Sequence, residues 1–335
     1  MTKMLLYSDN HFSTYSSIFR SRGEKYSARL ENQIDTINWI ESLAADEECD
    51  AVICLGDFFD RDDLSAEEIS ALKNIDWNEN AQHVFLVGNH ETPVADNEYN
   101  SCDLFNLLPE CDVISEPCKV RINGTEICYL PYAKESNRKN LVDLFGEVSS
   151  KRIILSHNDI KNINYGSFIS QTGYDIEEID RCCDLFINGH IHNEGCYGKL
   201  INIGNITGQN FNENCFKYRH RALIVDVDTL EVKSITNPYA LNFAKIEYGD
   251  LNFPDNLPNN SIVTVKCKEA YRGIVDSIKD DRILMKRTIV EYEPVDIKKE
   301  ETNIEIDHIK MFGDYCISNI GDSDMIREEL SYVCK

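Results

Sequence analysis

The chain has 335 residues, of which 42% are hydrophobic and 27% charged, a composition typical of a soluble globular protein with one large domain and an appendage, or with two ordinary domains. No apolar run is long enough to span a bilayer, and the N-terminus lacks the apolar core of a signal peptide, so we expect a cytoplasmic protein without a membrane anchor. The formal net charge of −24 argues against a protein that binds DNA by itself, because its surface repels polyanions.

Apolar runs and helical patterns alternate along the first part of the chain. Strands are predicted at residues 3–8, 50–56 and 83–88. A helix is predicted at residues 24–45, where Leu30, Ile34 and Ile37 have helical spacing. A second helix is expected to begin after Ser65, because Ser65 and Glu68 have the spacing of a capping box.

The second part of the chain is richer in hairpin signals. Asn123 and Gly124 lie between two alternating segments, the pattern of a tight β-hairpin. Buried strands are predicted at 152–156 and 184–188, and antiparallel strands within 199–237. Strands that alternate with helices and then pair as hairpins predict an α/β protein with two mixed sheets covered by helices.

A change in composition near the C-terminal end suggests a domain boundary. Residues 249–260 contain two prolines and four asparagines, so we expect a linker there. It would separate a large domain at 1–248 from a small α+β domain at 261–335 that begins with a βαβ unit. In the tail, Ile326, Leu330 and Val333 share a helical face, which could pack on its own domain or dock on a partner.

Thirteen cysteines are scattered along the chain, without a CxxC pair. Their number is odd and many lie in apolar runs. We therefore expect reduced cysteines that act as small core residues, in keeping with a cytoplasmic protein.

Polar side chains follow several predicted strands at the point where each strand ends. These residues are Asp9, His11, Asp57, Asn89, His90, His157, His190 and His192. Ligands gather at the carboxyl ends of strands in α/β folds, so we expect these side chains to meet. One histidine there is usually a satisfied polar residue, but so many buried together without a cation would be costly. Carboxylate, amide oxygen and imidazole suit Mn²⁺, Fe²⁺ or Zn²⁺, and one aspartate can bridge two ions roughly 3.5–4 Å apart.

Five motifs in order resemble those of the calcineurin-like metallophosphoesterases. They are DNH (9–11), GDFFDR (56–61), GNHE (88–91), SHND (156–159) and GHIH (189–192). Within that superfamily the chain is similar to the SbcD-type nucleases of DNA double-strand-break repair, and to the phage recombination endonuclease subunit among them. Chain length, the hairpin before LPY and the additional domain after the core carry this finer likeness. The resemblance implies a four-layer core of two mixed β-sheets flanked by helices, with a small α+β C-terminal cap domain.

The resemblance also implies a role for each strand-end residue. Asp9, His11 and His192 would hold one divalent ion, Asp57 would bridge, and Asn89, His157 and His190 would hold the second ion. The expected ions are Mn²⁺, with Mg²⁺, Fe²⁺ or Zn²⁺ as alternatives. His90 would bind no metal but would stabilise charge on the scissile phosphate or protonate the leaving oxygen. Glu91 could orient a neighbouring imidazole.

Some features depart from the pattern or allow two interpretations. Asn205 and Ile206 stand where relatives often have Ser or Thr followed by Pro, which puts the substrate-side loop in question. Arg61 could contact a phosphate or form a surface salt bridge. The basic cluster at 217–221 could touch a DNA backbone or be a solvated loop.

Three functions follow from these observations. The resemblance favours a metal-dependent nuclease that acts on DNA with an SbcC-type ATPase subunit, in the host cytoplasm if the chain is viral, and that forms a homodimer. The alternative is a phosphatase or phosphodiesterase for small phosphorylated substrates. A third is a scaffold on a decayed fold, which the presence of every expected ligand disfavours.

Overall fold

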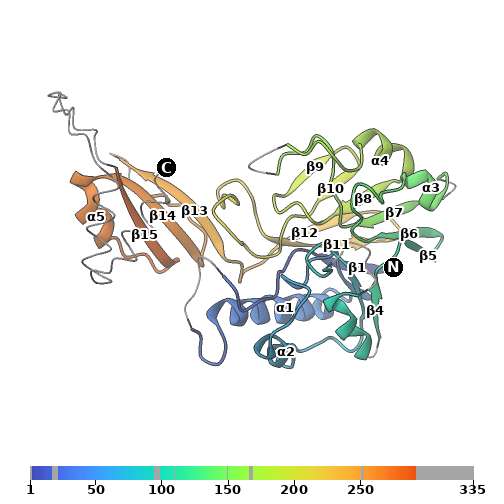
Figure 1. Ribbon diagram of the computed structural model, residues 1–335, viewed down its shortest axis with the longest axis horizontal. Coiled ribbons are helices and arrows are strands. Elements are labelled where there is room, and N and C mark those ends of the chain that lie inside the picture. The colour runs from blue at the N-terminus through green and yellow to red at the C-terminus, as the bar shows by residue number, and fades with distance from the viewer. Residues whose placement is uncertain are drawn as a thin grey trace, which may run out of the picture. The chain divides into compact units, whose positions relative to one another are not determined.

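The computed structural model of the protein describes residues 2–16, 22–93, 99–108, 110–148, 150–165, 169–249 and 253–291 (Figure 1). The predicted tail helix with Ile326, Leu330 and Val333 lies outside these residues. The eleven described cysteines are all free. None of the helices in the described ranges is long and apolar enough to cross a membrane.

The first sheet joins the N-terminal strands to a hairpin from much later in the chain. Its strands, in spatial order, are β12 (Val232–Thr236), β11 (Arg221–Asp226), β1 (Lys3–Tyr7), β2 (Ala51–Cys54), β3 (Gln82–Leu86) and β4 (Cys111–Ile114). Strands β1 to β4 run parallel, whereas β11 pairs antiparallel with both β1 and β12. The sheet is therefore mixed, as predicted.

The second sheet is mixed as well. Its order is β5 (Cys118–Ile122), β6 (Thr125–Leu130), β7 (Arg152–Ser156), β8 (Leu185–Asn188), β10 (Leu200–Asn202) and β9 (Gly195–Tyr197). The predicted hairpin at Asn123 and Gly124 joins β5 to β6, and both turn residues have positive φ, as a type I′ turn requires. Of the antiparallel strands expected within 199–237, β11 and β12 pair with each other as expected. Strand β10 instead lies in the second sheet, antiparallel to β9 and parallel to β8.

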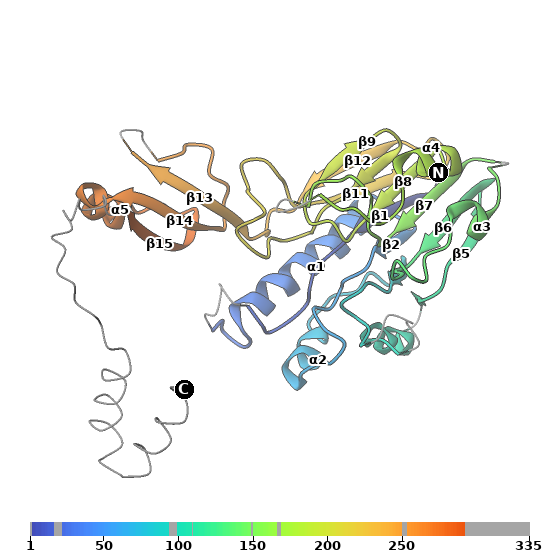
Figure 2. The same ribbon diagram turned by 45° about the horizontal axis from the view of Figure 1, so that its top comes forward.

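The apolar side chains of the two sheets form the central core. Leu6 and Leu86 of the first sheet pack in one cluster with Ile127 and Ile187 of the second. A separate cluster covers the outer face of the first sheet, where Ile37 of α1 packs against it. Helices α3 and α4 cover the outer face of the second sheet in the same way. This arrangement is the predicted four-layer core (Figure 2).

The helices in chain order are α1 (Ala28–Asp46), α2 (Ala66–Leu72), α3 (Leu141–Phe145), α4 (Ile176–Cys182) and α5 (Arg272–Ser277), with 3-10 turns η1 (Ser101–Leu107) and η2 (Glu269–Tyr271). The capping box of Ser65 and Glu68 is confirmed at α2. Helix α1 begins later than predicted, because Ser27 caps it and the backbone N–H groups of residues 24–26 donate to Glu31 instead.

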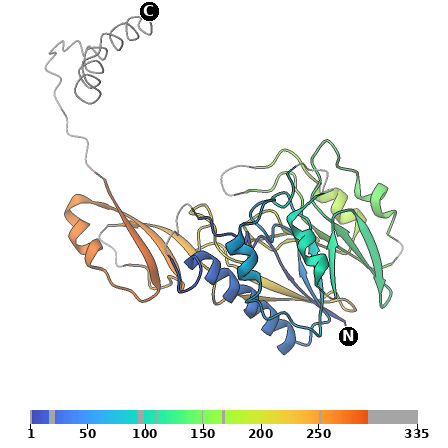
Figure 3. The same cartoon turned by 60° about the horizontal axis from the view of Figure 1, so that its bottom comes forward.

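A small sheet follows the core (Figure 3). Its order is β13 (Asn242–Tyr248), β14 (Ser261–Lys268) and β15 (Ile283–Glu291), all parallel. Strands β14 and β15 with α5 between them form the predicted βαβ unit, and Val275 of α5 packs on Val263 and Val265. Strand β13 precedes the expected linker at 249–260 yet pairs with β14 after it. The domain division at that linker stays a prediction.

Candidate metal centre

The strand-end residues of both sheets come together in one place. Asp9 and His11 follow β1, Asp57 follows β2, and Asn89 and His90 follow β3 in the first sheet. The second sheet supplies His157 after β7, and His190 and His192 after β8. Three groups of these side chains have ligand atoms within 4.8 Å of one another: Asp9, His11 and His192; His11, Asp57 and His90; and Asp57, His157 and His190. The facing ends of two sheets thus build one polar centre.

The backbone at this centre is strained. Asp9, His11, Asp57 and His190 have φ angles of 53°, 49°, 50° and 68°, in the left-handed region that residues with a Cβ rarely adopt. Each such residue costs about 1–3 kcal/mol and persists only where its surroundings fix it. The Asp9 backbone, for example, donates to the carbonyl of Gly56 at 3.1 Å, which ties β1 to β2. Strain at four neighbouring positions indicates that this geometry is held for chemistry.

Asp9, His11 and His192 form the first group. The Nε2 atoms of His11 and His192 lie 3.1 Å apart, and Nε2 of His192 lies 3.8 Å from Oδ1 of Asp9. Asp9 is fully buried, and its Oδ2 accepts from the backbone N–H of His190 at 3.0 Å. Its Oδ1 has no hydrogen-bond partner among the described residues. Two buried side chains and the partly exposed His192 therefore converge on one point.

Asp57 lies between this group and the second one. Its Oδ2 is 4.0 Å from Nε2 of His11 and 3.1 Å from Nε2 of His157. The buried Oδ1 of Asn89 has no hydrogen-bond partner within the described part of the chain. A buried amide oxygen without a partner is costly in an apolar setting but is a natural ligand for a hard or borderline cation.

Each of four imidazoles makes an outward contact through one ring nitrogen and leaves the other for the centre. The outward contacts are His11 Nδ1 to Asp60 Oδ1 at 3.1 Å, His157 Nδ1 to Leu55 O at 2.7 Å, His190 Nε2 to Asp159 Oδ1 at 3.2 Å, and His192 Nδ1 to Glu213 Oε1 at 2.9 Å. Such contacts fix the orientation and tautomer of metal-binding histidines. The donor set and its outer contacts fit two divalent ions.

His90 is the most exposed of the five histidines at the centre. Its side chain is 41% exposed, and its ring centre lies 4.6 Å from that of His11. Its backbone N–H donates to Asp57 Oδ1 at 3.0 Å, and its Nδ1 lies 2.9 Å from the carbonyl oxygen of Asp60. A carbonyl can only accept, so Nδ1 carries the hydrogen and Nε2 is left for a substrate.

Glu91 makes no hydrogen bond or ion pair with an imidazole of the described residues, contrary to the expectation from sequence. Its buried carboxylate accepts from the backbone N–H groups of Asp57, Phe59 and Gly88 at 3.2, 3.0 and 2.6 Å. Burial, and then the charge of Asp57, raise the pKa of Glu91 to about 7. Glu91 therefore holds the loop that carries Asp57.

The buried carboxylates of the centre are stabilised by positive charge on the neighbouring imidazoles. Burial raises the pKa of Asp57, but the neighbouring imidazole of His157 outweighs it and holds that pKa well below its usual range. Burial likewise lowers the pKa of His157, yet Asp57 raises it to about 9. His192 behaves in the same way, because burial is outweighed by Glu213 and its pKa rises to about 9. Without cations, protons supply the charge that these carboxylates need.

The sequence did not point to three residues that complete the centre. Asp60, Asp159 and Glu213 each contact one ligand imidazole. Asp60 in GDFFDR and Asp159 in SHND lie within the motifs, whereas nothing in the sequence singles out Glu213. Arg61 lies in ion pairs with Asp63 at 3.9 Å and Glu68 at 3.6 Å, which is the salt-bridge interpretation.

The basic cluster at 217–221 is partly neutralised. Arg221 pairs with Glu194 at 2.9 Å, and His220 is buried. The structure therefore adds no support for a DNA contact through these two residues.

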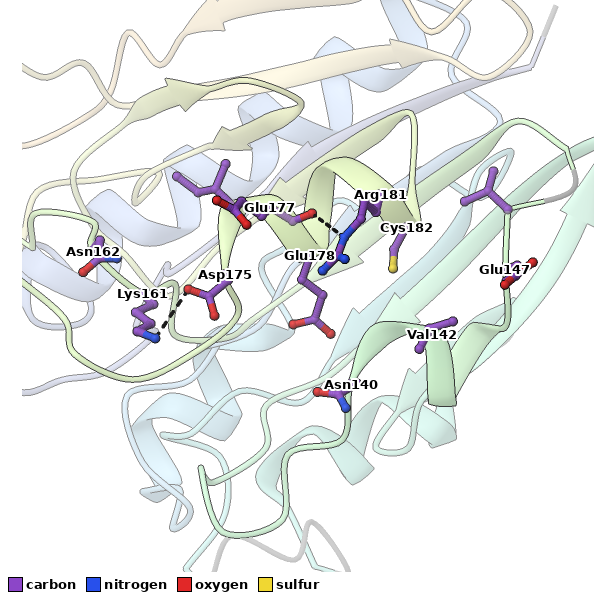
Figure 4. A pocket seen from close by; sticks show the side chains of 12 residues that line it. Asn140, Val142, Glu147, Lys161, Asn162, Asp175, Glu177, Glu178, Arg181 and Cys182 are labelled. Atoms are coloured by element: carbon purple, nitrogen blue, oxygen red, sulfur yellow. Dashed lines mark hydrogen bonds and ion pairs between the residues drawn. The ribbon is translucent and has the colours of Figure 1, made fainter.

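A cavity of about 1010 Å³ lies away from the metal centre, between α3 and α4 (Figure 4). Its lining includes the carboxylates of Glu147, Glu177 and Glu178, and Lys161 there pairs with Asp175 at 3.6 Å. The residues that line it include none of the strand-end residues. Its surplus of carboxylates disfavours a phosphorylated substrate.

A sequence model of the calcineurin-like phosphoesterases matches residues 2–194, which contain all eight strand-end residues of the centre. The chain belongs to the calcineurin-like phosphoesterase family. The loop with Glu213 and the small sheet of this phosphoesterase lie beyond the matched region. No curated protein sequence matches the chain.

Several solved structures are similar to this phosphoesterase at low identity. An archaeal phosphodiesterase is 16% identical with a TM-score of 0.36, over 70% of this chain and 99% of the other. YfcE, a phosphoesterase from E. coli, is 12% identical with a TM-score of 0.33, over 70% and 100%. A dimetal phosphatase from Danio rerio is 12% identical with a TM-score of 0.39, over 70% and 99%.

Proposed function

We propose that this calcineurin-like phosphoesterase hydrolyses phosphodiester bonds of DNA with two divalent ions, as the nuclease subunit of an SbcCD-type complex. The position of Asp57 carries the hydrolytic part of the proposal. Its Oδ2 lies within 4.0 Å of Nε2 of both His11 and His157, so one carboxylate can serve two ligand groups. Asp9, His11 and His192 would hold one ion, Asn89, His157 and His190 the other, with Asp57 between them.

Two such ions, for which the resemblance favours Mn²⁺, would supply Lewis acidity toward a phosphoryl oxygen and an activated water. The protein supplies position and protons. His90 is partly exposed beside the centre, and its Nδ1 is occupied by the Asp60 carbonyl. In the doubly protonated ring Nε2 also carries a hydrogen, and this N–H would donate a hydrogen bond to the phosphate and its proton to the leaving oxygen, leaving His90 neutral. Asp57 fixes the backbone of His90 through its Oδ1.

The choice of DNA rests on the likeness to SbcD-type nucleases and on the small sheet that follows the core. A net charge of −24 makes unaided binding to a polyanion unfavourable. We therefore propose that an SbcC-type ATPase partner supplies most of the affinity for DNA. We also propose that this chain forms a homodimer.

The same net charge favours a second candidate, a phosphatase or phosphodiesterase for small phosphorylated substrates. A small substrate carries few phosphates, so the repulsion it meets is weaker than that on a DNA duplex. The metal centre alone serves both functions equally.

Hydrolysis of three substrate classes with Mn²⁺ separates the two candidates. Linear duplex DNA, a cyclic nucleotide and a phosphomonoester are compared at equal concentration, with and without a co-purified ATPase partner. The proposal predicts cleavage of DNA ends that the partner stimulates, and loss of all activity in Asp57→Ala. Efficient turnover of the small substrates with no cleavage of DNA, even with the partner, would establish the second candidate instead.

A further inference from the structure

One loop outside the family-matched region reaches back to the metal centre. The segment between β10 and β11 carries Glu213, whose side chain is 3% exposed. Its Oε1 lies 2.9 Å from Nδ1 of His192 and accepts from the amide of Asn210 at 3.1 Å. Its Oε2 accepts from the amide of Asn205 at 2.9 Å and from the backbone N–H of Gln209 at 2.7 Å. Both carboxylate oxygens are thus fully engaged.

We propose that Glu213 is a positioning residue that holds His192 ready as a metal ligand. A carboxylate can only accept, so the hydrogen of His192 is kept on Nδ1 and the lone pair on Nε2. That Nε2 is the atom 3.1 Å from His11 Nε2 and 3.8 Å from Asp9 Oδ1. The inference rests on the proposed metal centre.

Asn205 shows that the loop is built around this contact. Its amide donates to Glu213, and its backbone N–H donates to the carbonyl of His192 at 3.1 Å. The residue therefore ties the loop to both the backbone and the side-chain partner of the ligand.

The other outward contacts are less specialised. Asp159, which faces His190, is 32% exposed, so water can replace part of its contact. His157 is held by a backbone carbonyl, which no substitution removes. Glu213, by contrast with Asp159, is a buried carboxylate. Its loss should weaken binding of the ion that His192 would hold and leave binding of the other ion unchanged.

The test is calorimetric titration of Mn²⁺ into the metal-free full-length protein. For the wild type, we expect two binding events. Glu213→Gln keeps the size but weakens the acceptor and adds a donor, so one event should weaken by roughly 10- to 100-fold while the other is retained. Asn205→Ala should weaken the same event by less. Glu126→Gln is the matched control, because Glu126 is another buried carboxylate. It pairs with Arg152 at 2.8 Å near the start of β6 and β7, whereas the metal centre lies where the strands end. Glu126→Gln should leave both events unchanged.

The tautomer of His192 gives a second readout that a merely structural role would not move. In ¹⁵N spectra of the metal-free wild type, recorded at an alkaline pH where the His192 ring is neutral, the hydrogen should sit on Nδ1, and in Glu213→Gln the two tautomers should mix. Unchanged Mn²⁺ affinities in Glu213→Gln, or equal weakening of both events, would overturn the inference. If the wild type itself binds no Mn²⁺, the metal centre fails as a whole. If Glu213→Gln does not fold, the Asn205→Ala titration and spectrum decide by the same criteria.

Discussion

Nε2 of His157 lies 3.1 Å from Oδ2 of Asp57, although the two residues end strands of different sheets and are a hundred residues apart. The contact joins β2 of the first sheet to β7 of the second at the open edge of the core. Both side chains are buried, so the pair is shielded from water. A site that depends on this contact depends on the packing of the whole core.

Asp57→Asn should abolish joint metal binding. The amide keeps the shape but loses the charge that both ligand groups share, and the loss should exceed the roughly 100-fold that an outer contact is worth. Metal content after dialysis against Mn²⁺, together with phosphodiesterase activity, measures it. Asp143→Asn on the exposed face of α3 is the control. Full metal content in Asp57→Asn would refute the bridging role.

His90→Gln should separate catalysis from metal binding. We expect kcat for an unactivated diester to fall by roughly 10²- to 10⁴-fold, because a proton donor is lost, with Mn²⁺ affinity unchanged. The fall should be smaller for a p-nitrophenyl ester, whose leaving group needs no proton. An equal fall for both esters would argue against proton donation by Nε2.

Metal affinity should rise with pH. In the metal-free protein burial lowers the pKa of His157 and His192, but Asp57 and Glu213 raise these pKa values to about 9. Both rings are therefore doubly protonated at neutral pH, and each must lose one proton when it binds a metal ion. The stabilisation from these raised pKa values is complete below about pH 6.5 and is lost as the pH rises through 9. The metal-free protein should therefore lose stability from these pairs between pH 7 and 9.

Thermal unfolding at fixed free Mn²⁺ between pH 6 and 8.5 measures this effect. The gain in Tm caused by Mn²⁺ should grow with pH, and calorimetry in two buffers should detect released protons. A gain that shrinks with rising pH would contradict the protonated state assigned to the two rings.

Arg152→Met should destabilise the fold without touching the metal centre. Arg152 is 1% exposed and donates to Glu126 and to backbone carbonyls of Phe145 and Cys182. Its removal takes the buried partner of Glu126 and leaves the exposed Arg121 at 2.9 Å, so the cost should fall below the roughly 3–5 kcal/mol of an uncompensated buried charge. Urea unfolding measures the loss, and Mn²⁺ titration of the folded variant should match the wild type.

The sequence predicted the strands that build the centre because each is a short apolar run that ends in a polar motif. Such local patterns show where Asp9, Asp57 and His157 lie on their strands, and the resemblance supplied their expected roles. Helices α3 and α4 were not predicted, since they are too short for a periodic pattern. The pairing of β13 with β14 joins residues on both sides of the polar segment at 249–260. The composition of that segment predicted a domain boundary, but composition carries no information on which strands pair across it.

Glu213 was missed for a related reason. It lies in a polar loop after the last motif, and its contact with His192 arises only when β10 and β11 take their places in different sheets. No spacing or composition in that loop singles out one carboxylate.

The most direct test is a crystal structure of the protein grown with Mn²⁺, with anomalous data collected at the manganese edge. We expect two peaks, one among Asp9, His11 and His192 and one among Asn89, His157 and His190, with Asp57 between them. No anomalous peak at these residues, or a single peak that Asp57 does not touch, would contradict it.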